Sequence, residues 1–347
     1  MKPTRQISVG GVPIGGSAPI TVQSMTNTRT DDVPATLEQI RRLADAGCDI
    51  VRCAVPDMAA ARAIAEIKAA SPLPVVADIH FDYQLALEAV AAGADKIRIN
   101  PGNIGSRDRV KAVADACRSR GIPIRVGVNS GSIEKEILSK YGRSPSALVR
   151  SAMGHIHLLE SLNFTDICVS IKSSDVRETV TAYRALAQLT DCPLHIGVTE
   201  AGTAYNGLVR SAVGVGALLL DGIGDTLRVS LTADPVEEVK AGIAILKAAG
   251  LRTGGVRIIS CPTCGRTKID LIPLAAQVET ALAGVKRDIT VAVMGCAVNG
   301  PGEAREADYG VAGGDGEGVL FKKGRVVGKA PGSHLCQALL ELINSDK

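Results

Sequence analysis

The chain has 347 residues, of which 46% are apolar and 22% charged, and its formal net charge is +3. Aromatic residues make up only 2% and tryptophan is absent, so the stacking platforms that hold single-stranded nucleic acids are missing. The net charge is too small over this length to form a phosphate-backbone footprint. The composition is therefore that of a globular protein without a nucleic-acid partner.

The cysteine count and the N-terminal sequence indicate a cellular compartment. Nine cysteines are present, an odd number, and no apolar signal core follows the first residues. No apolar run approaches the ~20 residues that span a bilayer. We therefore expect a cytoplasmic protein with no membrane partner, in which clustered cysteines bind metal or carry out redox chemistry.

A strand-like run followed by an alanine-rich helical segment recurs eight times in the first 250 residues. The runs cover residues 20–24, 49–55, 74–80, 96–100, 123–129, 166–172, 193–199 and 226–231. The helical segments cover residues 36–46, 58–70, 83–92, 107–119, 146–162, 176–188, 206–220 and 236–249. Eight such units predict an α/β fold, a (β/α)8 TIM-type barrel over residues 1–250, with a hairpin at 6–16 as its floor. A doubly wound sheet is the alternative, but its glycine-rich loop after the first strand is absent.

The remaining residues, 251–347, have a different pattern that predicts a second, smaller domain. Strands are expected at 256–260 and 289–294, a hairpin at 318–327, and helices at 273–282 and 333–344. Fewer than 100 residues arranged in this way indicate a small α+β domain.

Positive charges gather at the ends of the predicted barrel strands, where barrel enzymes place their chemistry. The five cations are Arg52, Arg98, Arg125, Lys172 and Arg228. Because buried like charges repel, their convergence on one opening favours a phosphate or diphosphate ligand that would neutralise them. The alternative for each single cation is an ion pair with a carboxylate at a neighbouring strand end.

Uncharged polar and titratable residues share the inward face with these cations, because side chains two or four apart along a strand point the same way. Candidate ligand-binding residues are Asn100, Asn129, His195, Thr199 and Ser230. Asp78, His80 and Glu200 are candidates for general acid and base catalysis, although a hydrogen-bonded structural role is the alternative for a histidine at a strand end.

Three cysteines of the second domain follow its predicted strands. Cys261 and Cys264 form a C-x-x-C motif, and Cys296 precedes a Gly-Pro-Gly turn that could present Glu303 as an oxygen ligand. Three thiolates with a replaceable fourth ligand favour an iron–sulfur cluster, whereas structural zinc sites usually have four Cys or His ligands. Zinc, or no metal, stays the alternative. The other six cysteines are expected to be buried as small apolar residues.

The sequence resembles the bacterial 4-hydroxy-3-methylbut-2-enyl diphosphate synthases of the non-mevalonate isoprenoid pathway. The matching segments occur in order along nearly the whole chain, at residues 22–28, 77–82, 98–103, 125–129, 171–174, 197–202, 261–266 and 294–303. Each segment alone is a weak signal, whereas the ordered set is specific.

This resemblance implies reductive ring opening and dehydration of 2-C-methyl-D-erythritol 2,4-cyclodiphosphate in a substrate-binding barrel, residues 1–250. It also implies a [4Fe–4S] cluster domain, residues 251–347, with Cys261, Cys264, Cys296 and Glu303 as the ligands. Flavodoxin or ferredoxin would supply electrons, and the family's members are head-to-tail homodimers. The alternatives are a redox-inert phosphosugar lyase or aldolase with a structural zinc module, and a non-catalytic phosphate-binding protein.

Overall fold

The computed structural model describes residues 3–296 and 305–346. The chain divides into two compact units, Met1–Arg252 and Thr253–Lys347. Each unit has a hydrophobic core of its own. Among the described residues, no helix is long and apolar enough to cross a membrane.

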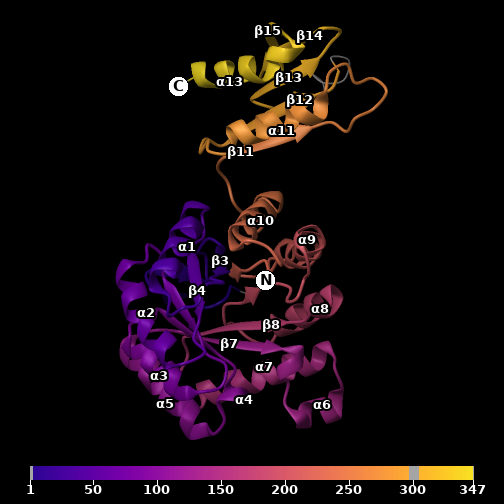
Figure 1. The fold of residues 1–347 in the computed structure, drawn as a ribbon. Helices are drawn as coiled ribbons and strands as arrows, with labels where there is room; N and C mark the ends of the chain where they lie inside the picture. Colours follow the sequence, from indigo (N-terminus) through magenta and orange to yellow (C-terminus); the bar gives the residue numbers. More distant parts are fainter. Residues whose placement is uncertain (1–2, 297–304, 347) are drawn as a thin grey trace. The chain divides into compact units, whose positions relative to one another are not determined.

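The first unit is a barrel of eight parallel strands, which confirms the predicted fold (Figure 1). The strands are β3 (Thr21–Met25), β4 (Ile50–Ala54), β5 (Val75–Asp78), β6 (Lys96–Ile99), β7 (Ile124–Asn129), β8 (Ile167–Lys172), β9 (His195–Ile196) and β10 (Thr226–Leu227). Adjacent strands pair in the order β8-β7-β6-β5-β4-β3-β10-β9, and a bridge between Val169 and Leu194 links β8 to the residue before β9. The last two strands have only two residues each, shorter than their apolar runs predict.

Helices surround the barrel and connect its strands (Figure 1). The main ones are α1 (Val33–Asp45), α2 (Met58–Ala70), α3 (Tyr83–Ala91), α5 (Arg107–Arg120), α7 (Pro145–Glu160), α8 (Val176–Leu186), α9 (Ala204–Leu220) and α10 (Pro235–Ala248). Aspartate N-caps fix several helix starts; Asp57, for example, accepts a hydrogen bond from the backbone N–H of Ala60. Two short helices, α4 (Pro101–Ile104) and α6 (Lys135–Tyr141), and a 3-10 turn η1 (Ser130–Ser132) lie in connections where the sequence predicts no helix, because such short segments carry too little periodicity.

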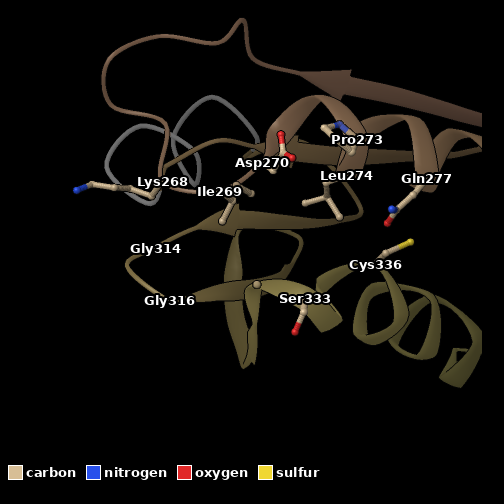
Figure 2. Close-up of a pocket in the computed structure, with 11 residues that line it drawn as sticks. Lys268, Ile269, Asp270, Pro273, Leu274, Gln277, Gly314, Gly316, Ser333 and Cys336 are labelled. Atoms are coloured by element: carbon tan, nitrogen blue, oxygen red, sulfur yellow. The ribbon is translucent and has the colours of Figure 1, made fainter.

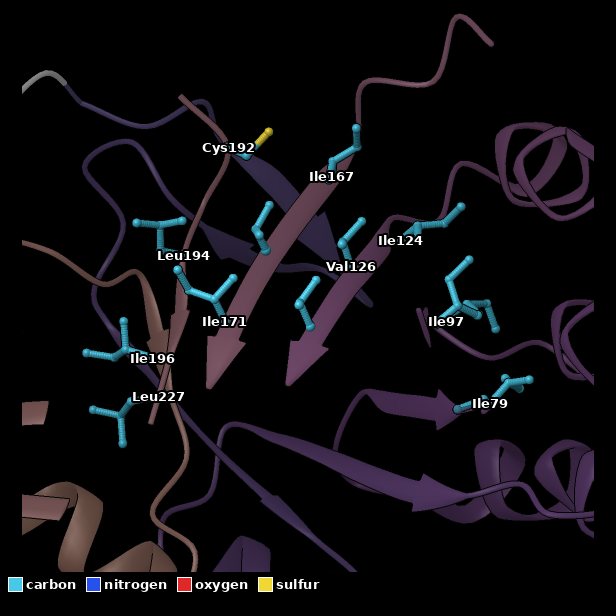
Figure 3. Close-up of a cluster of buried hydrophobic side chains, with 14 of the residues drawn as sticks. Ile79, Ile97, Ile124, Val126, Ile167, Ile171, Cys192, Leu194, Ile196 and Leu227 are labelled. Carbon is cyan, nitrogen blue, oxygen red and sulfur yellow. The ribbon is translucent and has the colours of Figure 1, made fainter. Parts of the chain in front are cut away.

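The two faces of the barrel strands differ in character. Alternate residues such as Ile97, Val126 and Ile171 point outward and pack under the helices (Figure 3). The residues between them, Arg98 and Arg125 among them, therefore point into the barrel. This alternation is what directs the polar side chains of the predicted site to the barrel interior.

A hairpin closes one end of the barrel, as the sequence predicts. Strands β1 (Ile7–Val9) and β2 (Val12–Ile14) pair antiparallel, with both turn glycines at positive φ. The hairpin's apolar residues pack against the first inward-facing residues of three barrel strands. The resulting floor consists of Ile7, Val9, Ile14, Ile50, Val76 and Cys168.

The second unit is an α+β domain built on one five-stranded sheet, as expected. Its strands, in their order across the sheet, are β11 (Val256–Ser260), β12 (Ile289–Met294), β13 (Tyr309–Gly313), β14 (Glu317–Lys322) and β15 (Arg325–Pro331). The first three are parallel and the last two antiparallel. Strand β13 is not among the predicted strands, because its sequence YGVAG is short and rich in glycine.

Two helices complete this unit, α11 (Leu271–Leu282) and α13 (Leu335–Ser345), the latter preceded by the 3-10 turn η2 (Gly332–His334). Leu274, Val278 and Leu339 from the two helices form a core with the sheet. A pocket of about 360 Å³ lies between the start of α11 and the residues around η2 (Figure 2). Cys336 lines this pocket at the start of α13, at a distance along the chain from the other cysteines of the unit.

Candidate functional site

The strand register and the electrostatic interactions place all five predicted cations near one another in the barrel. Arg98 on β6 lies beside Arg125 on β7, and Asp78 on β5 lies beside Arg98. Arg52, Lys172 and Arg228 belong to the same group, because burial and the charges of Arg125 and Arg228 lower the pKa of both Arg52 and Lys172. Arg228 is half-buried, and the other four cations are less than one-tenth exposed.

Asp78 is the shared counter-ion of two of these cations. Its Oδ1 accepts a hydrogen bond of 3.0 Å from Nη1 of Arg98, and its Oδ2 lies 3.7 Å from Nε of Arg52. Burial by itself would raise the pKa of the Asp78 carboxyl, but the positive charges around it outweigh that effect and hold the pKa well below its usual range. Asp78 is therefore ionised at neutral pH.

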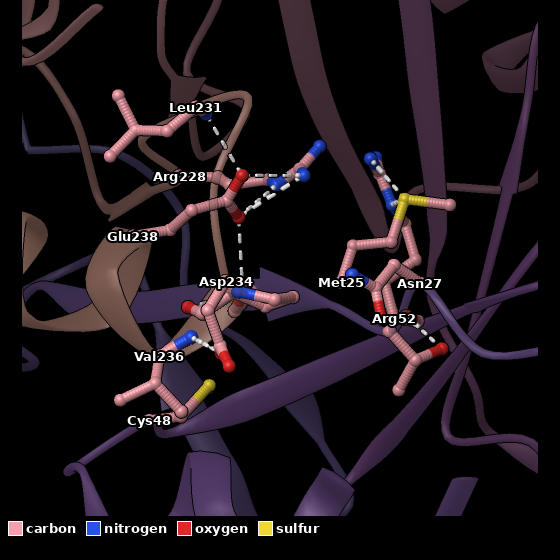
Figure 4. A network of polar contacts seen from close by, with 12 residues as sticks. Met25, Asn27, Cys48, Arg52, Arg228, Leu231, Asp234, Val236 and Glu238 are labelled. Atoms are coloured by element: carbon pink, nitrogen blue, oxygen red, sulfur yellow. Dashed lines mark hydrogen bonds and ion pairs between the residues drawn. The ribbon is translucent and has the colours of Figure 1, made fainter. Parts of the chain in front are cut away.

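A second carboxylate, not anticipated from the sequence, neutralises Arg228. Glu238 on α10 is 3% exposed and accepts hydrogen bonds of 3.2 and 3.1 Å from Nε and Nη2 of Arg228 (Figure 4). The same carboxylate accepts the backbone N–H of Leu231, which fixes the chain just beyond β10. Three of the five cations therefore form ion pairs with carboxylates, which was the alternative to ligand binding: Arg52, Arg98 and Arg228.

Arg125 and Lys172 are the two cations without a counter-ion. Neither side chain forms a hydrogen bond or an ion pair with any residue in the described part of the chain. Burial and the charge of Arg98 lower the pKa of Arg125 to about 10, and burial and the charge of Arg125 lower the pKa of Lys172. Because both lie on neighbouring strands, they offer one concentrated patch of positive charge to an anion.

The remaining predicted residues divide into surface, structural and interior positions. His80 is exposed, with Nε2 3.6 Å from Oδ2 of Asp78. Asn100 caps α4 through a 3.0 Å hydrogen bond from the backbone N–H of Gly102. His195 is completely buried, and its Nδ1 is 3.4 Å from Oγ1 of Thr226, deeper than the strand ends.

Four further candidates lie at or just beyond the carboxyl ends of their strands. Asn129 begins the turn η1 and exchanges hydrogen bonds of 3.0 Å with Ser132. Thr199 and Ser230 are half-buried, and Glu200 is exposed. Glu200 has a φ of 51°, a left-handed conformation that costs energy for a residue with a side chain and that recurs at functional sites.

Sequence reasoning missed three side chains that contact or adjoin this site. Glu238 gave no signal, because a glutamate in a first helical turn is ordinary. Met25 accepts hydrogen bonds from Nε and Nη2 of Arg52 at 3.2 and 3.0 Å, a contact that strand parity alone could have suggested (Figure 4). Lys96 has the same parity as Arg98 but begins its strand rather than ending it.

Gly127 provides the space that Arg98 occupies. A Cβ at this position would lie 2.8 Å from Nη2 of Arg98 and closer still to its Nε. We therefore expect Gly127→Ala to displace the guanidinium and lower the free energy of unfolding by about 1–3 kcal/mol, as measured by denaturant titration. Gly131→Ala is the matched control, because a Cβ there has no neighbour within 4 Å. Equal effects of the two substitutions would contradict this interpretation.

In the second unit, the three predicted thiol ligands follow two adjacent parallel strands. Cys261 comes directly after β11 and Cys296 two residues after β12, at the same edge of the sheet. The loop carrying Cys264 is fixed to this edge by a hydrogen bond of 2.9 Å from the backbone N–H of Lys268 to the carbonyl of Gly295. All three thiols are free and at least partly accessible.

Backbone N–H groups point at two of these thiols. The backbone N–H of Gly295 donates a hydrogen bond of 3.2 Å to Sγ of Cys261, and the backbone N–H of Arg266 lowers the pKa of Cys264. No three Cys, His, Asp or Glu side chains in the described residues lie close enough to hold a single metal ion. An iron–sulfur cluster fits this donor set in its chemistry, because proteins hold such clusters through cysteine thiolates. Glu303 lies outside the described residues.

Five of the other six cysteines have the buried environment expected for an apolar residue. They are completely or almost completely buried: Cys48, Cys53, Cys117, Cys168 and Cys192. Burial raises the pKa of Cys117 to about 12, which keeps that thiol protonated and unreactive. Cys336 is only half-buried and packs against the core of the second unit.

Fold and site together define a (β/α)8-barrel protein with a cluster of buried cations in its interior and a second, cysteine-bearing α+β unit. The chain belongs to the GcpE family: residues 4–243 match the GcpE TIM-barrel domain and residues 257–345 match the GcpE protein C-terminal domain. The two matches fall on the two compact units of the chain.

Curated relatives match nearly the whole chain. A Geobacter sulfurreducens protein is 61% identical over 97% of this chain and 96% of its own length. Proteins of Fusobacterium nucleatum and Clostridium perfringens are 59% and 56% identical, each over 99% of this chain and over 97% and 99% of their own lengths. All three are named 4-hydroxy-3-methylbut-2-en-1-yl diphosphate synthase (flavodoxin).

More distant solved structures share the barrel fold alone. The Yersinia pestis dihydropteroate synthase has a TM-score of 0.52 at 12% identity and covers 71% of this chain and 98% of its own. The sialic acid synthetase of Leptospira borgpetersenii has a TM-score of 0.52 at 13% identity, covering 72% and 90%.

Proposed function

We propose that this chain is an iron–sulfur oxidoreductase that converts 2-C-methyl-D-erythritol 2,4-cyclodiphosphate to 4-hydroxy-3-methylbut-2-enyl diphosphate by reductive ring opening and loss of water. The names of relatives that are 56–61% identical over nearly the whole chain support this activity. The observation that carries the proposal is the patch formed by Arg125 and Lys172, two buried cations with no counter-ion among the described residues. A cyclic diphosphate supplies the negative charge that these two side chains lack.

The barrel residues have distinct roles in this proposal. Arg125 and Lys172 bind the phosphoryl oxygens directly, since nothing described competes for their N–H groups. Arg52, Arg98 and Arg228 add positive potential while their carboxylate partners hold the side chains in place. The substrate's hydroxyl and phosphoryl groups receive hydrogen bonds from the polar residues at the strand ends, namely Asn100, Asn129, Thr199 and Ser230.

Of the three candidate acid–base residues, the two that are exposed are proposed to transfer protons. Asp78 is ion-paired and ionised, so it positions Arg52 and Arg98 rather than donating a proton. His80 and Glu200 are both exposed and follow the carboxyl ends of β5 and β9, at the same end of the barrel. We assign general acid and base roles to these two residues.

Cys261, Cys264 and Cys296, with Glu303, would hold a [4Fe–4S] cluster. Such a cluster supplies electrons one at a time and offers a Lewis-acidic iron where the carboxylate ligand can be replaced. The relatives' names specify flavodoxin, so flavodoxin or a ferredoxin is the proposed electron donor for this chain.

We also propose that two copies form a head-to-tail homodimer. Helix α9 exposes an unusually apolar face, on which Tyr205, Val213 and Leu220 are 77%, 58% and 77% exposed. An apolar surface of this kind on a helix marks an interface. Light scattering should give twice the mass of one chain, and Val213→Asp should give monomers, whereas Lys240→Asp on neighbouring α10 should not. A monomeric wild-type chain would contradict the proposal.

The activity is tested on the full chain, purified and assayed without oxygen. With the cyclodiphosphate and a strong artificial one-electron reductant, ³¹P NMR should show the cyclic diphosphate signals replaced by those of a linear diphosphate ester. The control reaction omits the reductant and should leave the substrate unchanged. Protein that contains iron and sulfide but produces no linear diphosphate under reducing conditions would overturn the proposed function.

A further inference from the structure

Helix α7 places a histidine on its buried face, outside the group of residues assigned to the site. The buried residues of α7 are apolar except for Ser151 and His155, which lie one turn apart. His155 is only 5% exposed. A buried histidine needs polar partners, because its ring nitrogens have lost their hydrogen bonds to water. The contacts of His155 therefore indicate its role.

One partner of His155 comes from the connection after β7. Nε2 of His155 lies 2.9 Å from Oε1 of Glu134, the residue that precedes α6. Burial by itself would raise the pKa of the Glu134 carboxyl, but His155 and Ser151 outweigh that effect and lower the pKa to about 2. Glu134 is therefore ionised at neutral pH. Its contact with His155 fastens the chain just beyond η1 to α7.

The same ring also lies against the connection after β6. A Cβ on Gly102 would lie 3.2 Å from Cε1 of His155 and 3.4 Å from Oδ1 of Asn100. A side chain at position 102 would therefore press on the ring and on the amide together. The backbone N–H of Gly102 donates a hydrogen bond of 3.0 Å to that Oδ1. His155 thus packs against the residue that holds the side chain of Asn100.

The two connections meet at residues that we assign to substrate binding. Nδ2 of Asn100 donates a hydrogen bond of 3.5 Å to the carbonyl of Ser132. The hydroxyl of Ser132 in turn exchanges hydrogen bonds of 3.0 Å with the backbone of Asn129. His155 contacts both connections from α7 and therefore supports Asn100 and Asn129 together.

We propose that His155 is a positioning residue, which sets the placement of Asn100 and Asn129 by holding the connections after β6 and β7 in one arrangement. This inference rests on the proposed function, in which both asparagines bind the cyclodiphosphate. Inorganic diphosphate is bound through its charge and depends on Arg125 and Lys172, which belong to the strands themselves. The cyclic substrate also needs correctly placed hydrogen bonds to its hydroxyl groups. His155 therefore acts on selectivity for the cyclic substrate rather than on the attraction of diphosphate.

The test compares the binding of the cyclodiphosphate with that of inorganic diphosphate. Both are titrated calorimetrically into the full, cluster-containing chain without reductant, so that no turnover occurs. His155→Phe keeps a ring against Gly102 but removes the nitrogen that contacts Glu134. It should weaken cyclodiphosphate binding about tenfold, because displaced amides lose one or two hydrogen bonds to the substrate. Binding of inorganic diphosphate should stay nearly unchanged. With reductant and saturating substrate, kcat should also stay nearly unchanged while KM rises.

Two further variants test the same contact. His155→Gln should restore cyclodiphosphate binding, because the amide nitrogen of glutamine can donate from about the position of Nε2. Glu134→Gln changes the contact from its more exposed partner, so it remains usable if His155→Phe folds poorly. It should also weaken cyclodiphosphate binding. The double variant with His155→Phe should bind no more weakly than His155→Phe alone, because both substitutions remove one contact.

His157→Phe is the matched control. His157 lies on α7 two residues beyond His155, but its side chain is exposed. This variant should bind both diphosphates as the wild type does.

The outcomes separate this inference from the proposed function. If His155→Phe loses stability but binds the cyclodiphosphate as tightly as the wild type, His155 has a structural role alone and the inference is overturned, while the proposed function stands. Equal losses of affinity for the two diphosphates would also overturn it, because selectivity would then be unchanged. A wild-type chain that binds inorganic diphosphate but not the cyclodiphosphate would overturn the proposed function and this inference with it.

Discussion

Cys296→Ala should lose iron and sulfide together and reduce reductive ring opening by about 100-fold or more, because a thiolate ligand contributes directly to cluster binding. Cys296 lies at the edge of the sheet where Cys261 and Cys264 also lie, and its removal leaves two thiolates. The measurement is the iron and sulfide content per chain after anaerobic reconstitution, followed by the ³¹P NMR assay.

The control is Cys336→Ala, in the same unit. Cys336 is also a free, half-buried thiol, but it lies at the start of α13 and lines a different pocket. It should retain full iron, sulfide and activity. Because the unit has its own core, circular dichroism can show that both variants stay folded. Full iron content in Cys296→Ala with intact activity would remove this cysteine from the ligand set.

Asp78→Asn should lower the free energy of unfolding by about 3–5 kcal/mol, because it leaves Arg52 and Arg98 buried without their shared carboxylate. Denaturant titration of the full chain measures the change. Asp31→Asn is the control: Asp31 also pairs with an arginine, Arg29, but that pair is at the surface. The Asp31→Asn variant should have the same free energy of unfolding as the wild type. A similar, small effect of both substitutions would show that Asp78 does not hold the arginines.

The effect of Asp78 should also depend on pH in a definite direction. Its pKa in the folded chain is held well below that of an unfolded aspartate, so the folded state binds fewer protons. The stabilisation is fully present above the unfolded pKa, about 3.9, and is lost as the pH falls further. The difference in stability between the wild type and Asp78→Asn should therefore shrink as the pH is lowered from about 5 to 2. A difference that grows at low pH would contradict this assignment.

Eight repeated strand–helix units were sufficient to predict the barrel. Strand parity was sufficient to predict the convergence of its inward-facing cations, because a period of two fixes the face of every residue on a strand. It could not predict which cations are paired. The partner of Arg228 comes from α10, and the rotation of a helix over a sheet depends on packing that no short sequence period records. Lys96 was not predicted either, because its parity matches that of Arg98 but it lies at the start of the strand, away from the ends where barrel sites form.

In the second unit, the C-x-x-C motif and Cys296 were recognisable because each follows a strongly β-forming run. Strand β13 was missed, since only packing against β12 and β14 makes a glycine-rich segment extended. The short strands β9 and β10 show the opposite error: their apolar runs continue past the point where the ladder ends.

The pairing pattern of the barrel cations has a consequence for how a ligand approaches. The neutralised arginines belong to β4, β6 and the segment after β10, whereas the unpaired Arg125 and Lys172 belong to the adjacent strands β7 and β8. The electrostatic potential across the opening is therefore asymmetric, and it is most positive near β7 and β8. A molecule that is more negative at one end is turned during its approach, before any specific contact forms. The barrel thus sets the orientation of its ligand by an imbalance of charge, and added salt weakens that steering.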